Sequence, residues 1–319
     1  MKQAALLLSG LLAITVAGCG VKQKAHEFSD SASNLASNTS KAVERLGTSA
    51  GTKLGLIEKK YDYVALAYQR TDAPEKIKVP YTQEEERFLG MALAAELFKR
   101  YPPYQDEELQ TYLTRVANVL ASCSDRPDLP ALVTVVQTEQ PLCHALPGGL
   151  ILISLGALRC CDTEAEIAGL LAQAWGHEQL RHPLELLEKV TQADANLAQF
   201  DSISALKMPD LEFSTLIQTT AAKMALEGLP TNRIKTAGAV ATRLLTRVGY
   251  EPGGLKAYLE QEQIFRRKKN PNAPLKDLGV YKDREAVIDA ELAELHVPGG
   301  GQSLAERYRQ ECYARLPAP

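Results

Sequence analysis

The sequence predicts an α+β fold that is mostly helical and contains one small β-sheet. Several long segments place apolar residues at the spacing of an amphipathic helix, whereas only two short runs, ALVTVVQT and GLILISL, have the composition of β-strands. The chain has 319 residues, of which 45% are apolar and 24% are charged. This is ordinary globular composition, and the length suffices for one large domain or two small ones.

The N-terminus has the layout of a secretory signal peptide. Lys2 gives a positive start, residues 4–17 form an apolar run that is too short for a comfortable membrane span, and the letters VAGC end the run at Cys19. A small residue before a cysteine at this place resembles a bacterial lipobox, in which the cysteine carries the lipid of the mature chain. We therefore expect residues 1–18 to be a lipoprotein signal peptide and Cys19 to be lipidated. The alternative is an ordinary signal peptide that happens to contain a cysteine.

The residue after Cys19 and the overall charge bear on location and partners. Gly20 is not the aspartate that, in the usual sorting rule, retains lipoproteins at the inner membrane, so we expect a lipid anchor on the periplasmic face of the outer membrane. The membrane is therefore one expected partner. The formal net charge of −3 gives no reason to expect nucleic acid. The basic run RRKK at residues 266–269 is expected to be a solvated loop.

Export would place the other cysteines in an oxidising compartment. They are Cys123, Cys143, Cys160, Cys161 and Cys312. An odd number leaves at least one thiol free or paired between chains, and the pairing stays open. Adjacent cysteines lack the two-residue gap of a zinc knuckle or a thioredoxin motif, so we assign the Cys160-Cys161 pair no role.

A tether and two helices are predicted before the two β-rich runs. Residues 19–80 contain the polar stretch SDSASNLASNTSKA and are expected to form a tether and an N-terminal helical segment. The folded domain begins at Tyr81, where Thr82 and Glu85 form a capping box for a helix that stops at the letters YPP. The run DEELQTYLTRVANVLASC predicts a second amphipathic helix.

The two β-rich runs are joined through CHALPGG, where the letters PGG supply turn chemistry. A helix capped by Thr163 and Glu166 follows and is expected to run to Pro183. Further helices are expected at Leu187–Ala205, Leu211–Glu227, Arg233–Val248, Gly254–Arg267 and Asp283–Leu295. We therefore expect the domain to span residues 81–267 and residues 268–319 to form a C-terminal loop and helix.

Four stretches resemble, in the same order, the M48 family of zinc metallopeptidases, which have the gluzincin form of the zincin fold. YTQEEERFLGMALAAELFKRYPPYQDEELQTYLTRVANVLA resembles its N-terminal helices, and SDRPDLPALVTVVQTEQPLCHALPGGLILISLGAL resembles its strand, turn and edge strand, where the turn normally reads NAFALPGG. DTEAEIAGLLAQAWGHEQLRHP resembles the zinc helix, and LLTRVGYEPGGLKAYLEQ resembles the segment after the third ligand. The resemblance covers residues 81–263 and implies a mostly helical zincin-like domain with a small sheet beside the zinc helix.

Active members of this family carry H-E-x-x-H on the zinc helix. Two histidines four residues apart lie on one helical face and bind the same ion, and the glutamate acts as general base on the zinc-bound water. The third ligand is a glutamate in E-x-x-A-D on a later helix, whose aspartate orients a ligand histidine.

Aligned with the family, this chain lacks most of those groups. Gln173 replaces the first histidine and Ala174 replaces the general base, whereas His177 matches the second histidine. Counting back from the letters GYEP places the third ligand at Ile234 and the aspartate at Gly238. The resemblance therefore implies no catalytic residue and no zinc cofactor, unless unrecognised ligands hold the metal.

Two other histidines, His182 and His144, are candidates for replacement ligands. His182 follows His177 by five residues, which is about 140° around a continuous helix, so the two side chains are expected to diverge. We expect His182 to lie at the negative C-terminal end of the zinc helix instead. His144 is expected to be a loop histidine with its own hydrogen bonds.

The run GLILISL corresponds to the edge strand on which family members lay an extended substrate. An unpaired strand edge can bind a peptide by adding it to the sheet. The resemblance therefore implies a peptide-binding edge formed by Leu150, Ile151, Leu152, Ile153 and Ser154. A fully paired, buried strand is the alternative.

Three functions stay open. The first is a lipid-anchored, periplasm-facing and peptidase-like protein that is inactive and binds an envelope protein or an unfolded peptide, as a scaffold, adaptor or chaperone. The second is an active zinc endopeptidase of envelope proteins with non-standard ligands. The third is a purely structural envelope lipoprotein. Metal content separates the first two, and the number of crosslinked partners separates the first from the third.

Overall fold

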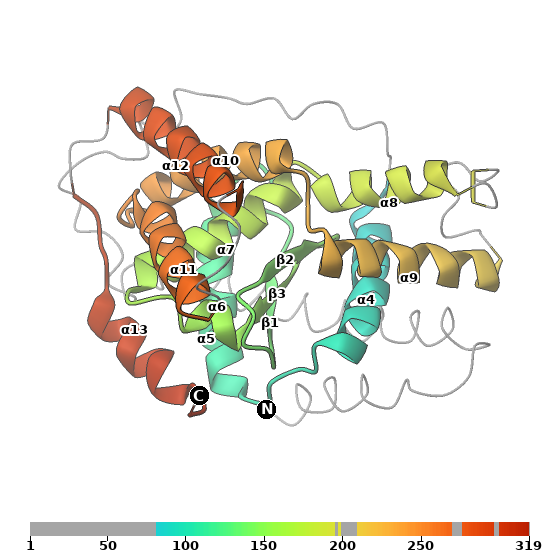
Figure 1. Ribbon diagram of the computed structural model, residues 1–319, viewed down its shortest axis with the longest axis horizontal. Coiled ribbons are helices and arrows are strands. Elements are labelled where there is room, and N and C mark those ends of the chain that lie inside the picture. The colour runs from blue at the N-terminus through green and yellow to red at the C-terminus, as the bar shows by residue number, and fades with distance from the viewer. Residues whose placement is uncertain (1–80, 195–196, 199–208, 270–275, 297–299, 319) are drawn as a thin grey trace.

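The computed structural model describes residues 81–194, 197–198, 209–269, 276–296 and 300–318 (Figure 1). The expected signal peptide, the expected lipidation site Cys19 and the expected tether to residue 80 lie outside the described residues. Within the described ranges, none of the helices combines the length and the apolar character that crossing a bilayer requires.

The predicted α+β class is confirmed, because the described part of the chain is mostly helical and contains one small sheet. The helices before and beside the sheet are α4 (Gln83–Arg100), α5 (Glu107–Ser122), α6 (Leu155–Leu158) and α7 (Glu164–Gln179). Those that follow are α8 (His182–Ala193), α9 (Asp210–Leu226), α10 (Thr231–Val248), α11 (Gly254–Lys269), α12 (Lys276–Leu295) and α13 (Ala305–Glu311), with the short 3₁₀ helix η2 (Tyr313–Arg315). The predicted capping box begins α4 at Thr82, whereas at α7 Thr163 is the N-cap but the Glu166 carboxylate accepts from the Asp162 N–H, so the second predicted box is not complete.

The sheet has three strands in the order β1-β3-β2, namely β1 (Leu132–Val136), β2 (Cys143–Leu146) and β3 (Leu150–Ser154). β3 pairs in parallel with β1 and antiparallel with β2, so it is the central strand. The prediction that Leu150–Ser154 forms a free edge is therefore wrong. The reason is that CHAL forms a strand of its own, which folds back through two glycines with positive φ and covers the second side of β3.

The two outer strands differ in how they are covered. The Tyr104 N–H donates to the Val135 carbonyl at 2.8 Å, and the Gln137 N–H donates to the Pro102 carbonyl at 2.7 Å. The segment before α5 thus runs along the outer side of β1. Among the described residues, no backbone group bonds to the outer side of β2, which is therefore the unpaired edge of the sheet.

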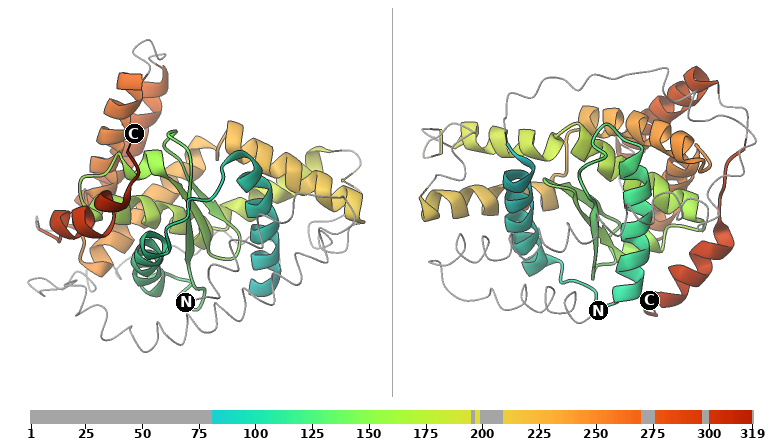
Figure 2. Two further views of the ribbon diagram at one scale, coloured as in Figure 1. Left: turned by 90° about the horizontal axis from the view of Figure 1, so that it is seen from below. Right: turned by 180° about the vertical axis from the view of Figure 1, so that it is seen from behind.

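Helix α7 lies at the centre of the domain, and every one of its residues is buried. Figure 1 shows α10, α11 and α12 on one side of it and α4, α8 and α9 toward its other end, and Figure 2 shows α8 and α9 extending together away from the sheet. Glycines allow the close packing. A Cβ on Gly176 would lie 2.8 Å from the Ala237 carbonyl oxygen of α10, and one on Gly254 would lie 2.3 Å from the Ala165 carbonyl oxygen.

The end of α7 differs from the prediction. The helix ends at Gln179, Arg181 adopts a left-handed φ of 56°, and α8 begins at His182. Pro183 therefore lies in the first turn of α8, where its missing N–H leaves no helical hydrogen bond unmade. The prediction that a single helix continues to Pro183 is wrong.

The C-terminal segment packs onto the domain. α12 lies against α10 and α11, and α13 places Tyr308 in the same buried cluster as Cys312. The RRKK run at residues 266–269 forms the last turn of α11, so the prediction of a loop there is wrong. The five cysteines after Cys19 are all free thiols.

Candidate functional site

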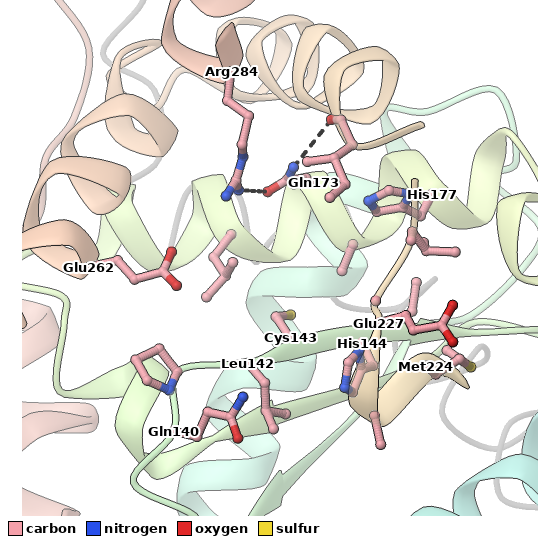
Figure 3. Close-up of a pocket in the computed structure, with 18 of the residues that line it drawn as sticks. Gln140, Leu142, Cys143, His144, Gln173, His177, Met224, Glu227, Glu262 and Arg284 are labelled. Atoms are coloured by element: carbon pink, nitrogen blue, oxygen red, sulfur yellow. Dashed lines mark hydrogen bonds between the residues drawn. The ribbon is translucent and has the colours of Figure 1, made fainter. Parts of the chain in front are cut away.

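A cleft with a volume of about 300 Å³ opens beside the middle of α7 (Figure 3). Its other walls come from β2 and the segment before it, the end of α9, the start of α10, and one side of α11 and α12. Its polar lining includes Gln173, His177, His144 and Arg284. The cleft therefore collects residues from elements that are far apart in the sequence.

The positions that the family alignment assigns to zinc meet in this cleft. Gln173 and His177 lie one turn apart on α7, and Ile234 lies in the first turn of α10. The Gln173 Nε2 atom donates a hydrogen bond to the Ile234 carbonyl oxygen at 3.3 Å. Ala174 also lines the cleft and is buried, whereas Gly238 lies one turn further along α10 and is not part of the lining. The fold thus joins the same positions that the alignment joins.

The Gln173 amide is held at both ends. Its Nε2 atom is bonded to the Ile234 carbonyl, and its Oε1 atom accepts a hydrogen bond from Arg284 Nη2 at 3.0 Å. Figure 3 shows Arg284 reaching from α12 toward this amide. The two contacts assign the amide oxygen to the guanidinium and the amide nitrogen to the carbonyl.

His177 and His182 are in direct contact, and the expectation that they diverge is wrong. Their Nδ1 atoms lie 2.9 Å apart, and the rings meet edge to face with centroids 5.1 Å apart. The prediction assumed one continuous helix, but the left-handed residue Arg181 ends that helix and starts a new one. His182 therefore lies at the N-terminus of α8, and not at the C-terminal end of α7.

The histidine pair is neutral at neutral pH. Burial lowers the pKa of His182 to about 4, and burial, with smaller contributions from His182 and the Arg284 charge, lowers the pKa of His177 well below its usual value. One ring then donates its Nδ1–H to the Nδ1 lone pair of the other. Since the acceptor ring carries its proton on Nε2, the pair keeps a single free nitrogen lone pair.

His144 lies on β2 and faces the cleft, so the expectation of a loop histidine is wrong. Burial lowers the pKa of His144 to about 4. The ring is therefore a neutral, partly buried group at neutral pH.

The comparison with protein families decides the relationship. The model of Peptidase family M48 matches residues 104–273, which is more than half of the chain. The chain belongs to the M48 peptidase family. No curated protein matches the chain. The matched range of this M48 protein contains the sheet, α7 and α10, which form the walls around the aligned zinc positions.

The donors in this M48 cleft do not fit a zinc ion. Zinc prefers nitrogen and sulfur ligands, so the Gln173 amide oxygen is a poor donor, and the Ile234 side chain offers none. The guanidinium of Arg284 is hydrogen bonded to that amide oxygen, and its positive charge opposes a dication at the same place. Among the residues that the structure describes, no three His, Cys, Asp or Glu side chains are grouped so that they could share a metal ion.

β2 presents its open edge to the cleft. The Ser154 N–H donates to the Leu142 carbonyl at 3.0 Å, so Leu142 and Ser154 are a hydrogen-bonded pair. In an antiparallel ladder hydrogen-bonded and non-hydrogen-bonded pairs alternate, so the pairs of Cys143 with Ile153 and of Ala145 with Ile151 are not hydrogen bonded. The register therefore turns the backbone groups of Cys143 and Ala145 away from β3. In the described part of the chain, no other backbone group bonds to them. This edge is not evident from the sequence, because CHAL has only four residues and directly precedes the PGG turn.

A buried acidic network near the end of α7 was also missed. Glu178 accepts hydrogen bonds from the Gly148 N–H at 3.1 Å and from Arg126 at 2.9 Å, and Arg126 also binds Glu86 of α4 at 2.6 Å. Burial raises the pKa of Glu178 to about 7, while Arg126 acts in the opposite direction. Glu178 thus holds the turn between β2 and β3 against α7. The signal in the sequence was a glutamate next to His177, near the end of a helix whose middle is largely apolar.

Proposed function

We propose that this M48-family protein is an inactive peptidase homologue that binds extended polypeptide segments of the cell envelope in its cleft. One observation carries the proposal. The aligned zinc positions meet in the cleft as Gln173, His177 and Ile234, and the Gln173 side chain is engaged by a backbone carbonyl and a guanidinium. Binding without cleavage suits a scaffold, an adaptor or a chaperone-like protein.

The residues around the aligned zinc site do not support hydrolysis. Ala174 has no group that could take a proton from water, and the loss of a general base alone typically costs about a hundred- to ten-thousand-fold in rate. His177 shares its Nδ1 with His182, so the pair supplies one free lone pair, whereas a catalytic zinc site uses three protein ligands.

The cleft wall supports peptide binding. The outward backbone groups of Cys143, which is half-buried on β2, can hydrogen bond to an extended chain laid along the strand, whereas Ala145 is buried. Leu170 and Met224 provide apolar surface in the same cleft for its side chains. An extended segment would thus form main-chain hydrogen bonds on one side and bury side chains on the other.

The proposed location is the periplasmic face of the outer membrane, with a lipid on Cys19. The support is the order of a positive start, a short apolar run and a small residue before the cysteine. Expressed in a bacterial host, the wild-type chain should fractionate with membranes and incorporate labelled palmitate, whereas Cys19→Ser should do neither. Recovery of wild-type chain without incorporated label would contradict the lipid anchor.

The proposed loss of peptidase activity is tested on the full chain carrying Cys19→Ser. We expect no zinc to remain after dialysis against buffer without chelator, and no cleavage of a labelled unfolded protein. Retention of one zinc ion per chain, lost in the His177→Ala variant together with cleavage activity, would establish an active peptidase instead.

Peptide binding along β2 is tested from the side of the ligand. A peptide that adds to a strand uses the N–H groups of every second residue, so methylation of those nitrogens should abolish binding. Methylation of the alternate set, in the same peptide, is the matched control and should leave binding intact. Equal effects of the two patterns would exclude strand addition. In cells, crosslinking to one fixed partner would favour a purely structural lipoprotein over a binder of many clients.

A further inference from the structure

We propose that Arg284 binds a carboxylate group of the polypeptide ligand, at the place in the cleft where the alignment puts the zinc ion. The inference rests on the proposed function, because the ligand is the segment that the cleft is proposed to take up. It adds the chemical class of that ligand: a chain that offers a carboxylate, either from its C-terminus or from an Asp or Glu side chain.

The Arg284 guanidinium enters the cleft with part of its hydrogen-bonding capacity unused. Nη2 donates to Gln173 Oε1 at 3.0 Å, which is a contact with a neutral group. Nε is buried and has no hydrogen-bond partner in the part of the chain that the structure describes. The unpaired Nε–H shows that the fold does not use the full hydrogen-bonding capacity of this guanidinium, and a ligand would reach it through its Nη atoms, since Nε itself is buried.

The other charges that line the cleft are compensated. Glu262 lies 2.6 Å from Arg266, and Glu227 lies 3.8 Å from Lys223. Arg284 forms no ion pair with any carboxylate of the described residues. A ligand carboxylate that enters the cleft therefore meets a cation whose charge is not already matched.

The guanidinium is also held in place before a ligand arrives. Its Cζ atom lies 5.7 Å from the centroid of the Tyr281 ring, and Gln173 fixes its other side. A planar guanidinium matches a carboxylate with two parallel hydrogen bonds, which a lysine ammonium cannot do. Partial exclusion of water in the cleft strengthens such a charged contact.

Figure 3 places the guanidinium across the cleft from β2, with Cys143 and His144 on the opposite wall. A peptide laid along β2 would therefore present one of its ends or side chains to Arg284. The edge strand fixes the direction and register of the chain, and the cation selects which residue occupies the position beside Gln173. Specificity would thus come from charge where active family members use a metal.

The test measures binding of fluorescent ten-residue peptides to the full chain with Cys19→Ser by anisotropy. Four peptides share one apolar sequence: one has a free C-terminus, one is amidated, one is amidated with a central Glu, and one is amidated with a central Gln. We expect at least one carboxylate peptide to bind about tenfold or more tightly than its uncharged counterpart, which corresponds to one charge-assisted contact.

Three variants separate the role of Arg284 from general charge. Arg284→Gln should remove the preference for the carboxylate, and Arg284→Lys should retain part of it because the charge stays and the planar fork is lost. Lys282→Gln is the matched control, since it removes an exposed positive charge from the same helix. It should bind as the wild type does. An undiminished preference in Arg284→Gln would overturn the proposal.

The four peptides also identify the source of the carboxylate. A preference for the free C-terminus that disappears on amidation indicates the chain end, and a preference for Glu over Gln indicates a side chain. Equal binding of all four peptides by the wild type would overturn the carboxylate site and leave peptide binding in place.

A second measurement keeps the two proposals distinguishable. The NMR signals of the Gln173 side-chain amide should shift when acetate is added to the wild type and should not shift in Arg284→Gln. If no peptide binds but the acetate-dependent shift is present, the proposed function fails and the carboxylate site stands. Absence of any shift in the wild type would overturn the site.

Discussion

Of the buried polar clusters on helix α7, the one at its first residue and the one in its middle differ in how their charges are matched. At the start, Glu164 accepts hydrogen bonds from the Tyr112 hydroxyl at 2.7 Å and the Tyr250 hydroxyl at 2.5 Å, and Arg307 of α13 binds both carboxylate oxygens. In the middle, Gln173 binds a carbonyl and the cation Arg284. The first cluster joins four elements of the fold, and the second faces a cleft.

The difference separates a structural cluster from a binding site on the same helix. Every acceptor of Glu164 that the structure shows is matched by donors from distant parts of the chain, and the charge is balanced by Arg307. Within the described ranges, the Arg284 cation has a neutral partner, Gln173, and a buried Nε–H that meets no acceptor. A matched cluster stabilises the fold and has nothing left to offer a ligand, whereas an unmatched one gains by binding.

The largest expected effect comes from breaking the matched cluster. Glu164→Ala leaves Arg307 without its carboxylate and two buried hydroxyls without their acceptor. Removing one partner of a buried ion pair typically costs about 3–5 kcal/mol, so the free energy of unfolding in urea should fall by that amount. The control is Glu306→Ala, whose pair with Arg309 is exposed and should contribute within about 0.5 kcal/mol. Equal losses in the two variants would show that the buried cluster is not special.

The next effect is the pH dependence of the histidine pair beside the cleft. The pKa of His182 is about 4 in the folded protein against an ordinary value of 6.5, and burial also lowers the pKa of His177 well below that ordinary value. Between pH 6.5 and 4 the unfolded chain therefore binds more protons, and stability falls as the pH falls. Each histidine adds a slope of up to about 1.4 kcal/mol per pH unit. The double variant His177→Gln/His182→Gln should have a shallower slope in unfolding experiments.

Glu178 acts with the opposite sign over an overlapping range. Its pKa is raised by burial to about 7 in the folded protein, against an ordinary value of 4.5. Between pH 7 and 4.5 the folded protein holds a proton that the unfolded chain has released, so stability rises as the pH falls. Glu178→Gln should remove this rise and expose the full histidine slope. An unchanged profile in both variants would mean that these groups do not set the pH dependence.

Much of the fold followed from local signals in the sequence. The capping residues Thr82 and Thr163 start α4 and α7, and the apolar period of the helices and the family resemblance both required a mostly helical domain with a small sheet. The alignment also predicted that Gln173, His177 and Ile234 belong to one place, and the cleft joins them. Helix caps and helical periodicity depend on residues that are close in the sequence, and the aligned positions depend on the fold that the family shares, so both can be predicted from the sequence.

The errors arose where a single residue or a distant partner decided the outcome. The left-handed turn at Arg181 splits one expected helix into two and brings His182 onto His177, and no glycine or asparagine marks that turn. CHAL is a four-residue strand whose pairing with β3 depends on the turn that follows it. Arg284 lies outside the range that matches the family, so neither pattern nor resemblance placed it in the cleft.

A smaller effect on the free energy of unfolding is expected when Gln173, the neutral partner of Arg284 in the cleft, is replaced. Gln173→Leu keeps the volume of the side chain but removes the hydrogen bonds to Ile234 and Arg284, each of which contributes on the order of 1 kcal/mol or less. The unfolding free energy should therefore fall by about 1–2 kcal/mol, less than for Glu164→Ala. Gln192→Leu, which removes an exposed contact to Glu188 on α8, is the control and should change it little. A loss as large as that of Glu164→Ala would show that the middle of α7 is a structural cluster too.

The smallest effect on folding is expected at the residue proposed to matter most for binding. Arg284→Gln removes a charge that has no ion-pair partner among the described residues and a buried Nε–H that has no acceptor. The variant loses the hydrogen bond to Gln173, which is destabilising, but it also removes the buried Nε–H that has no acceptor, which is stabilising. The unfolding free energy should therefore change by less than about 1 kcal/mol. The same variant should lose about tenfold in affinity for carboxylate peptides. A large drop in stability would place Arg284 with Glu164, as a residue that holds the fold together, and would remove the distinction between the two clusters of α7.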